Sequence, residues 1–337
     1  MRTILSLFRV LAVLASASYA VPLPADDQHP PASPPPSSPV SPAHPVATLL
    51  QIWHDAARNR DVPVKIYYPA DTKSPCPLII FSHGLGGNRE GYAYLGQGWA
   101  GAGFIVIHVQ HLGSDDAVWR GAGADAYEKL TQAVADTRNA LNRAADVKFA
   151  ITQMLDLVTR PRFPLKGLVD PSEIGMAGHS FGAWTTLAVT GQKLPNGLTL
   201  TDPRIKAAIA MSAPVPGGAL RSAGEFASIP IPVFHMTGTR DNSPIGETAA
   251  PDRRIPFDQS KTPGTCLLIL NGADHMAFSG HILNAYHDED ARYQAIILKA
   301  SITFWNANLL HNAADSAWLY KGGFAKELGA QGTFETR

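Results

Sequence analysis

The sequence predicts an α/β fold with a mostly parallel central sheet and helices on both faces. Short apolar runs of strand length alternate along the chain with stretches of helical period. The runs are apolar throughout and do not alternate with polar residues, which is typical of strands buried on both sides. Residues 47–337 contain no internal repeat and no second low-complexity break, so we expect them to form one domain.

The expected elements follow in chain order. An early strand at 62–68 belongs to an outer hairpin, and the buried strands after it are 77–81, 104–109, 174–177, 205–210, 233–236 and 266–270. Between them, one helical face carries Val147, Ile151, Met154, Leu155 and Val158. A late helix around Ile297, Ala300 and Phe304 closes the sheet.

The composition excludes several classes of protein. Hydrophobic residues make up 45% of the chain and charged residues 17%, so it can bury a core and is not disordered as a whole. The formal net charge is +0, which leaves no basic field to hold a polyanion. Nucleic acid is therefore not an expected partner.

The N-terminus has the pattern of an export signal. Arg2 and Arg9 flank an apolar run that ends in small residues at Ala20, which predicts a signal peptide over 1–20 cleaved after Ala20. The run is too short to span a bilayer, so we expect a secreted or periplasmic protein with no transmembrane segment after cleavage. Residues 21–46 hold ten of the 27 prolines and are expected to be a disordered linker.

One segment carries a sharp chemical signal. Gly178-His179-Ser180-Phe181-Gly182 comes directly after the expected strand at 174–177 and leads into a helix-compatible stretch. Glycines two positions before and two after a serine allow the tight strand-to-helix turn that exposes a nucleophilic hydroxyl. Ser180 is the expected nucleophile.

A serine nucleophile needs a base and a carboxylate that orients it, and in this architecture they follow the serine in the order acid, then histidine. Asp241 and His275 each come just after an expected strand, at the edge where α/β sheets build their sites. They are our assignments. The competing candidates are Asp202, Asp252, Asp258 and Asp274 for the acid, and His281 and His287 for the base. His235 lies inside a strand and is interpreted as a satisfied core residue.

Acyl transfer also needs donors for the oxyanion of the tetrahedral intermediate. The glycine-rich loop 83–87 follows the strand at 77–81, and we assign the backbone amides of Leu85 and Phe181 to this role. The acidic cluster 287–290 lacks metal-ligand spacing and is interpreted as the N-terminal cap of the last helix. We therefore expect no metal and no cofactor.

These residues resemble a known family. The loop with Leu85, the strand after it and the Ser180 motif look like the plasma-type platelet-activating-factor acetylhydrolases and their bacterial relatives grouped with dienelactone hydrolases, within the α/β-hydrolase superfamily. The resemblance runs with gaps from Val62 to His275. It implies the α/β-hydrolase fold, a Ser-Asp-His triad and the oxyanion amides of Leu85 and Phe181. The lipid-docking helices of the plasma enzyme have no recognisable counterpart.

The sequence thus predicts a serine esterase that acts on a small-molecule or lipid ester through an acyl-enzyme. An acyltransferase or peptidase with the same triad, or a catalytically silent binding module, are the alternatives. The connection at 212–229 is too short for a large cap domain, so we expect an open site that prefers acyl chains of about two to six carbons. Cys76 and Cys266 enter strands several positions apart, so we expect free thiols.

Overall fold

A computed structural model describes residues 43–215, 224–279 and 288–337. The expected signal peptide, the expected linker up to residue 42, His281 and His287 lie outside these ranges. The first described residues already belong to the sheet: the His44 amide donates to the Gly101 carbonyl, and Val46 pairs with Pro69. Residues 44–46 of the range that was expected to be linker therefore contact the sheet and its helices.

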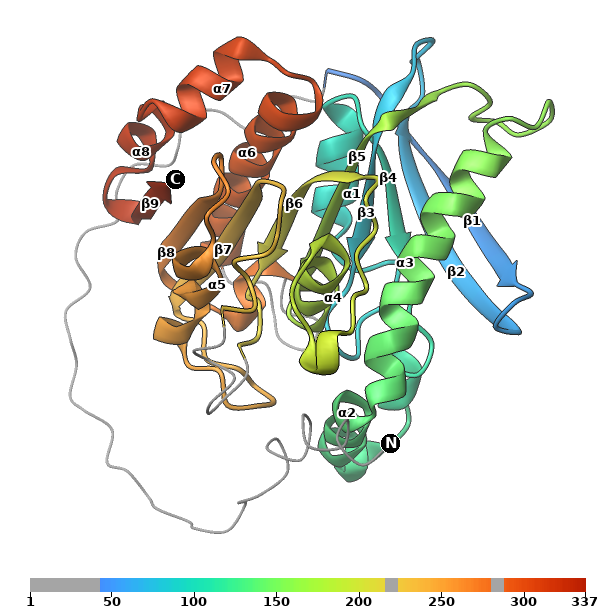
Figure 1. The fold of residues 1–337 in the computed structure, drawn as a ribbon, viewed down its shortest axis with the longest axis horizontal. Helices are drawn as coiled ribbons and strands as arrows, with labels where there is room; N and C mark the ends of the chain where they lie inside the picture. Colours follow the sequence, from blue (N-terminus) through green and yellow to red (C-terminus); the bar gives the residue numbers. More distant parts are fainter. Residues whose placement is uncertain (1–42, 216–223, 280–287) are drawn as a thin grey trace.

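The described strands form one sheet in the order β1-β2-β4-β3-β5-β6-β7-β8-β9 (Figure 1). Their bounds are β1 Val46–Asp55, β2 Arg60–Pro69, β3 Cys76–Ser82, β4 Ile105–Val109, β5 Val169–His179, β6 Ile205–Met211, β7 Val233–Arg240, β8 Cys266–Asp274 and β9 Gly332–Thr336. From β4 to β8 every neighbouring pair is parallel, whereas β1, β2 and β9 join the sheet antiparallel. The prediction of a mostly parallel sheet is confirmed.

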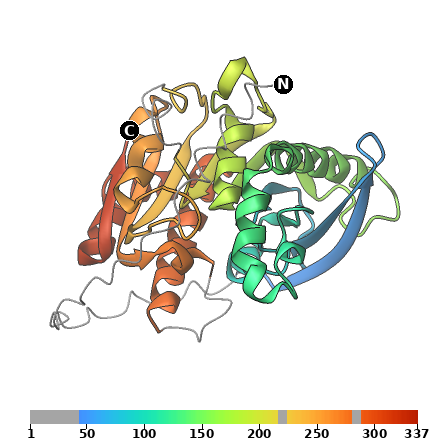
Figure 2. The same ribbon diagram turned by 90° about the horizontal axis from the view of Figure 1, so that it is seen from below.

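Helices cover both faces of this sheet (Figures 1 and 2). They are α1 Ala93–Gly101, α2 Ala126–Ala135, α3 Thr137–Leu157, α4 Phe181–Thr190, α5 Ile255–Gln259, α6 Asp288–Leu309, α7 Ala313–Tyr320 and α8 Gly323–Leu328. On one face, Trp99 of α1 meets Trp305 of α6 edge to face at 5.8 Å. On the other, Ile151 of α3 and Leu187 of α4 belong to a second apolar cluster. An apolar core therefore lies on each face of the sheet.

Each expected strand is present, and the structure adds elements that we did not predict. The expected outer hairpin is present, with β1 as the partner whose residues we had not assigned, and the C-terminal elements α7, α8 and β9 were not expected. The acidic residues that follow position 287 do begin a helix, α6. However, α6 is not the last helix, because α7 and α8 follow it.

Parallel strands place their carboxyl ends at one edge of the sheet, and the site residues lie there. His83 follows β3, Ser180 follows β5, Asp241 follows β7 and His275 follows β8. Loops far apart in sequence therefore meet at this edge.

The two cysteines are buried and free, as predicted. Cys76 begins β3 and Cys266 begins β8, and three strands separate β3 from β8 in the sheet. Among the described residues, no helix is both long enough and apolar enough to cross a membrane.

Candidate active site

Ser180 occupies the tight turn between β5 and α4 with a left-handed backbone, φ 55° and ψ −118°. A non-glycine residue pays steric strain in this region, which persists only where the surroundings enforce it. Around Ser180, backbone atoms of neighbouring segments pack closely against the turn. A Cβ on Gly178 would lie 2.3 Å from the Gly182 oxygen, and one on Gly182 would lie 1.9 Å from the Ser82 oxygen. Glycine is required at both flanking positions, and the turn presents the serine hydroxyl at the sheet edge.

The structure brings the three predicted side chains together. His275 Nε2 lies 3.0 Å from Ser180 Oγ, and His275 Nδ1 lies 2.7 Å from Asp241 Oδ1. An ionised carboxylate only accepts hydrogen bonds, so the Nδ1 proton of His275 points at Asp241. Nε2 is then the acceptor for the Ser180 hydroxyl. This tautomer is the one in which a histidine can remove a proton from serine.

Asp241 is fully buried and held on every side. Thr237 Oγ1 donates to its Oδ2 at 2.8 Å, and Arg253 Nη2 lies 3.2 Å from its Oδ1. Burial alone would raise the pKa of the Asp241 carboxyl. The hydrogen bond from His275 and the charge of Arg253 outweigh burial, so the net shift of this pKa is downward. Asp241 therefore stays ionised beside the histidine.

Arg253 was not anticipated from the sequence. Its guanidinium also donates to the Ser212 carbonyl at 2.6 Å and to the Asp241 carbonyl at 3.1 Å. The side chain is buried. It connects the loop after β6 to the loop after β7. It therefore holds Asp241 in position and also favours its ionised form.

The competing acids have other partners. Asp274 is exposed and accepts hydrogen bonds from the amides of Met276 and Ala277 at 2.8 and 3.1 Å, so it caps the turn that begins with His275. The remaining candidates lie elsewhere: Asp202 pairs with Arg204, Asp258 pairs with Arg254, and Asp252 lies in the turn Ala250–Arg254. His235 is buried in β7 as expected, but its Nδ1 has no partner in the described structure.

The two predicted oxyanion donors lie beside the serine. Leu85 and Phe181 line the same pocket as Ser180. Within the described part of the chain, neither backbone amide donates to another group. The amides that flank Leu85 are occupied, since Gly84 donates to Tyr92 Oη at 3.3 Å and Gly86 donates to the Ser114 carbonyl at 2.9 Å. Phe181 also begins α4, where the helix dipole favours a negative charge.

Comparison with known proteins finds similarity to one group of enzymes. A family model described as "Platelet-activating factor acetylhydrolase, isoform II" matches residues 45–122. A platelet-activating factor acetylhydrolase from Bos taurus is 29% identical over 60% of this chain and 48% of its own length. One from Canis lupus familiaris is 27% identical over 72% of this chain and 59% of its own length. Over these regions the chain is similar to platelet-activating factor acetylhydrolases.

The similarity to these acetylhydrolases is partial. A third relative, from Cavia porcellus, is 28% identical over 41% of this chain and 36% of its own length. The chain thus spans between about a third and three-fifths of the length of the curated acetylhydrolases it matches. The region matched by the family model contains Leu85 but ends before Ser180.

A hydrogen-bonded pair that sequence reasoning missed connects the parts of the site. Tyr92 Oη lies 2.8 Å from His179 Nδ1, and it accepts from the Gly84 amide at 3.3 Å. His179 Nε2 donates to the His275 carbonyl at 2.9 Å. Because that carbonyl can only accept, the Tyr92 hydroxyl must donate to Nδ1. Burial holds the pKa of His179 well below its usual range, so the ring is neutral. The pair links the loop that carries Leu85 to the turn that carries His275.

The pocket above Ser180 has a volume of about 150 Å³. Its apolar walls are Val134, Phe181, Pro214, Pro244, Ile245 and Met276. Among the described residues that line it, none is Asp, Glu, Lys or Arg. Nor do three His, Cys, Asp or Glu side chains group as metal ligands anywhere in 43–215, 224–279 or 288–337. The described part of the lining therefore presents mostly apolar side chains around the serine.

Proposed function

We propose that this chain is a serine carboxylic-ester hydrolase with the α/β-hydrolase fold, its catalytic domain following an exported leader and a proline-rich linker. The observation that carries the proposal is Ser180 Oγ at 3.0 Å from His275 Nε2, on a strained turn that opens into a pocket. The sequence similarity to acetylhydrolases also supports ester hydrolysis.

In the proposed reaction, Ser180 Oγ attacks the ester carbonyl carbon while its proton moves to His275 Nε2. The carbonyl oxygen becomes an oxyanion against the amides of Leu85 and Phe181. Collapse of this intermediate breaks the ester bond, and the leaving alcohol takes the proton from His275. Water then attacks the acyl-serine while its proton moves to His275, and His275 returns the proton to Ser180 Oγ as the bond to the acyl group breaks and the carboxylic acid leaves. Asp241 holds the tautomer and stabilises the imidazolium throughout.

The pocket supports short, uncharged acyl groups as substrates. Its volume of about 150 Å³ is smaller than the ~300–1,000 Å³ of pockets that bury drug-sized ligands. The described residues of its lining include no Asp, Glu, Lys or Arg that would pair with a charged acyl group. An acetyl ester, the kind of substrate in the name of the relatives, fits these limits.

Export rests on Arg2, the apolar run and Ala20, all in the part of the chain outside the described residues. Sequencing of the N-terminus of the mature protein should give Val21 as the first residue. Retention of Arg2 would contradict export by signal cleavage.

The activity is tested with p-nitrophenyl esters of graded acyl length. We expect the rate to be highest for acyl chains of about two to six carbons, with no jump above the critical micelle concentration. Ser180→Ala should lower kcat by about 10⁴-fold or more, with an unchanged circular dichroism spectrum. Hydrolysis that survives this substitution would contradict the proposal. Competing alcohols added to the assay separate hydrolysis from acyl transfer, since a transferase would yield mainly the new ester.

A further inference from the structure

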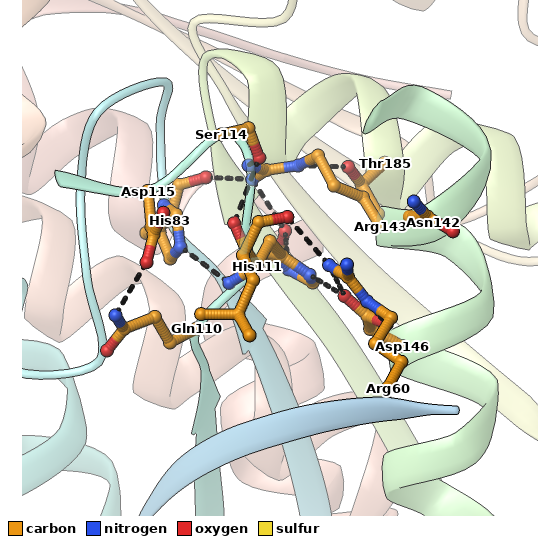
Figure 3. Close-up of polar contacts among 12 residues, drawn as sticks. Arg60, His83, Gln110, His111, Ser114, Asp115, Asn142, Arg143, Asp146 and Thr185 are labelled. Atoms are coloured by element: carbon orange, nitrogen blue, oxygen red, sulfur yellow. Dashed lines mark hydrogen bonds and ion pairs between the residues drawn. The ribbon is translucent and has the colours of Figure 1, made fainter. Parts of the chain in front are cut away.

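Arg143 of α3 is a charged residue with no exposure to solvent, and it lies directly behind the pocket. Figure 3 shows its side chain reaching from α3 between Ser114 and Thr185. A buried guanidinium is costly unless hydrogen bonds and charges compensate it. Burial accordingly lowers the pKa of Arg143 against the opposing effect of Asp146. The hydrogen-bond partners of Arg143 show which parts of the site it holds in position.

Three contacts secure the loop that carries Leu85. Arg143 Nη2 donates to the His83 carbonyl and, at 3.1 Å, to Ser82 Oγ. Nη1 donates to Ser114 Oγ at 2.9 Å, and the Ser114 carbonyl in turn accepts the Gly86 amide at 2.9 Å. Backbone on both sides of Leu85 is therefore fixed, directly or through one residue, by the same guanidinium.

The opposite side of Arg143 faces the start of α4. Its guanidinium carbon lies 4.5 Å from the centroid of the Phe181 ring, a cation–π distance. Nε donates to Thr185 Oγ1 at 3.1 Å, and Thr185 Oγ1 donates to the Phe181 carbonyl at 3.0 Å. Arg143 thus contacts the residue that bears the second free amide.

We propose that Arg143 is a positioning residue for the oxyanion hole, holding the amides of Leu85 and Phe181 at one common point. The two donors come from the loop after β3 and the first turn of α4, and this side chain contacts both. Electrostatic catalysis depends on donors that are fixed before charge develops. This inference rests on the proposed function.

A purely structural role would affect stability alone, whereas a positioning role must appear in the transition state. Arg143→Lys keeps the charge but loses the forked donors that reach several partners at once. We expect kcat to fall by about 30- to 300-fold, near the range for loss of one oxyanion donor, with KM within threefold. A short-chain trifluoromethyl ketone adds to Ser180 as a hemiketal whose oxyanion needs the same amides. Its affinity should weaken by the same factor as kcat/KM.

Arg60 provides the matched control. It lies in the same polar cluster, donating to Asp146 at 2.9 Å and to the Leu112 carbonyl at 2.7 Å (Figure 3). Arg60→Lys should lower the melting temperature to a similar degree while kcat and the affinity for the ketone stay within threefold.

Ser114→Ala is a milder variant that keeps Arg143 and removes one acceptor, and it covers the case in which Arg143→Lys does not fold. We expect its kcat to fall by about three- to tenfold with the affinity for the ketone falling in parallel. If the folded variants keep wild-type kcat and ketone affinity, or if Arg60→Lys loses as much of both, the inference is overturned. An inactive wild-type protein would overturn the proposed function together with this inference.

Discussion

Within residues 43–215, 224–279 and 288–337, two Ser-His-Asp arrangements have nearly the same hydrogen-bond geometry. In the pocket, Ser180 Oγ and His275 Nε2 are 3.0 Å apart and His275 Nδ1 lies 2.7 Å from Asp241. Behind it, Ser82 Oγ lies 2.9 Å from His111 Nε2, and His111 Nδ1 lies 3.1 Å from Asp146 (Figure 3). The same tautomer argument applies to both histidines.

The two arrangements differ in the surroundings of their serines. Ser82 is fully buried in a regular strand, and its hydroxyl oxygen accepts a hydrogen bond from Arg143. Ser180 is only partly buried, sits on a strained turn and faces a pocket beside two free amides. Hydrogen-bond distances therefore do not identify a nucleophile. Access, backbone conformation and donors for the oxyanion are what distinguish the first arrangement from the second.

The largest expected difference comes from the pocket acid. Asp241→Asn should lower kcat by about 10³- to 10⁴-fold with the fold intact, because an amide no longer enforces the tautomer that leaves Nε2 free. Asp274→Asn, which changes only the cap of the following turn, should cost no more than about tenfold. Steady-state kinetics with circular dichroism on both variants checks this. The reverse order would reassign the acid while leaving Ser180 and His275 in place.

The matched change in the buried arrangement should act on stability instead. Asp146 is enclosed and pairs with Arg58 at 2.8 Å, Arg60 at 2.9 Å and His111. Asp146→Asn leaves Arg58 and Arg60 without this buried counterion, so we expect a loss of about 3–5 kcal/mol in the free energy of unfolding. Below the melting transition, kcat should stay within about threefold. Urea denaturation and kinetics on the same sample measure both quantities. A large loss of kcat with unchanged stability would give the buried arrangement a catalytic role.

Protonation of buried histidines outside the pocket should also make stability depend on pH. Burial lowers the pKa of His111 to about 4, and it lowers the pKa values of His108 and His235 to about 3 each. These folded-state pKa values lie below the ~6.5 of an unfolded chain, so the unfolded state binds more protons in between. Stability should be full above about pH 6.5 and fall as the pH is lowered toward 4, by on the order of 1 kcal/mol per pH unit for each group. A melting temperature that stays constant from pH 7 to pH 5 would contradict this.

Much of the fold could be predicted because its signal is local. The buried strands are continuous apolar runs bounded by glycine or proline, and they were placed to within a few residues. The edge strand β1 was missed because apolar Leu50 and Ile52 point to solvent, at 56% and 65% exposure, so the strand lacks the expected pattern. The short strand β9, which pairs with β8 at the other edge, also gave no signal.

The candidate site, too, was predicted in part from local sequence signals and in part not. Gly178 and Gly182 mark Ser180 within a five-residue motif. The structure places His275 beside Ser180 and Asp241 beside His275. Nothing comparable marks Arg143 or Arg253. Each is a single arginine whose burial depends on loops distant in sequence, and an arginine in a helix or loop is usually exposed. Networks of this kind become visible only when the chain is folded.

The most direct measurement is to locate the residue that reacts with a fluorophosphonate probe. The native protein is labelled, digested and mapped by mass spectrometry, with Ser180→Ala as the control. We predict a phosphonate on the peptide that carries Ser180, none on the peptide that carries Ser82, and no label in the control. Label on Ser82, or native protein that takes up no label at Ser180, would contradict the assignment of the nucleophile.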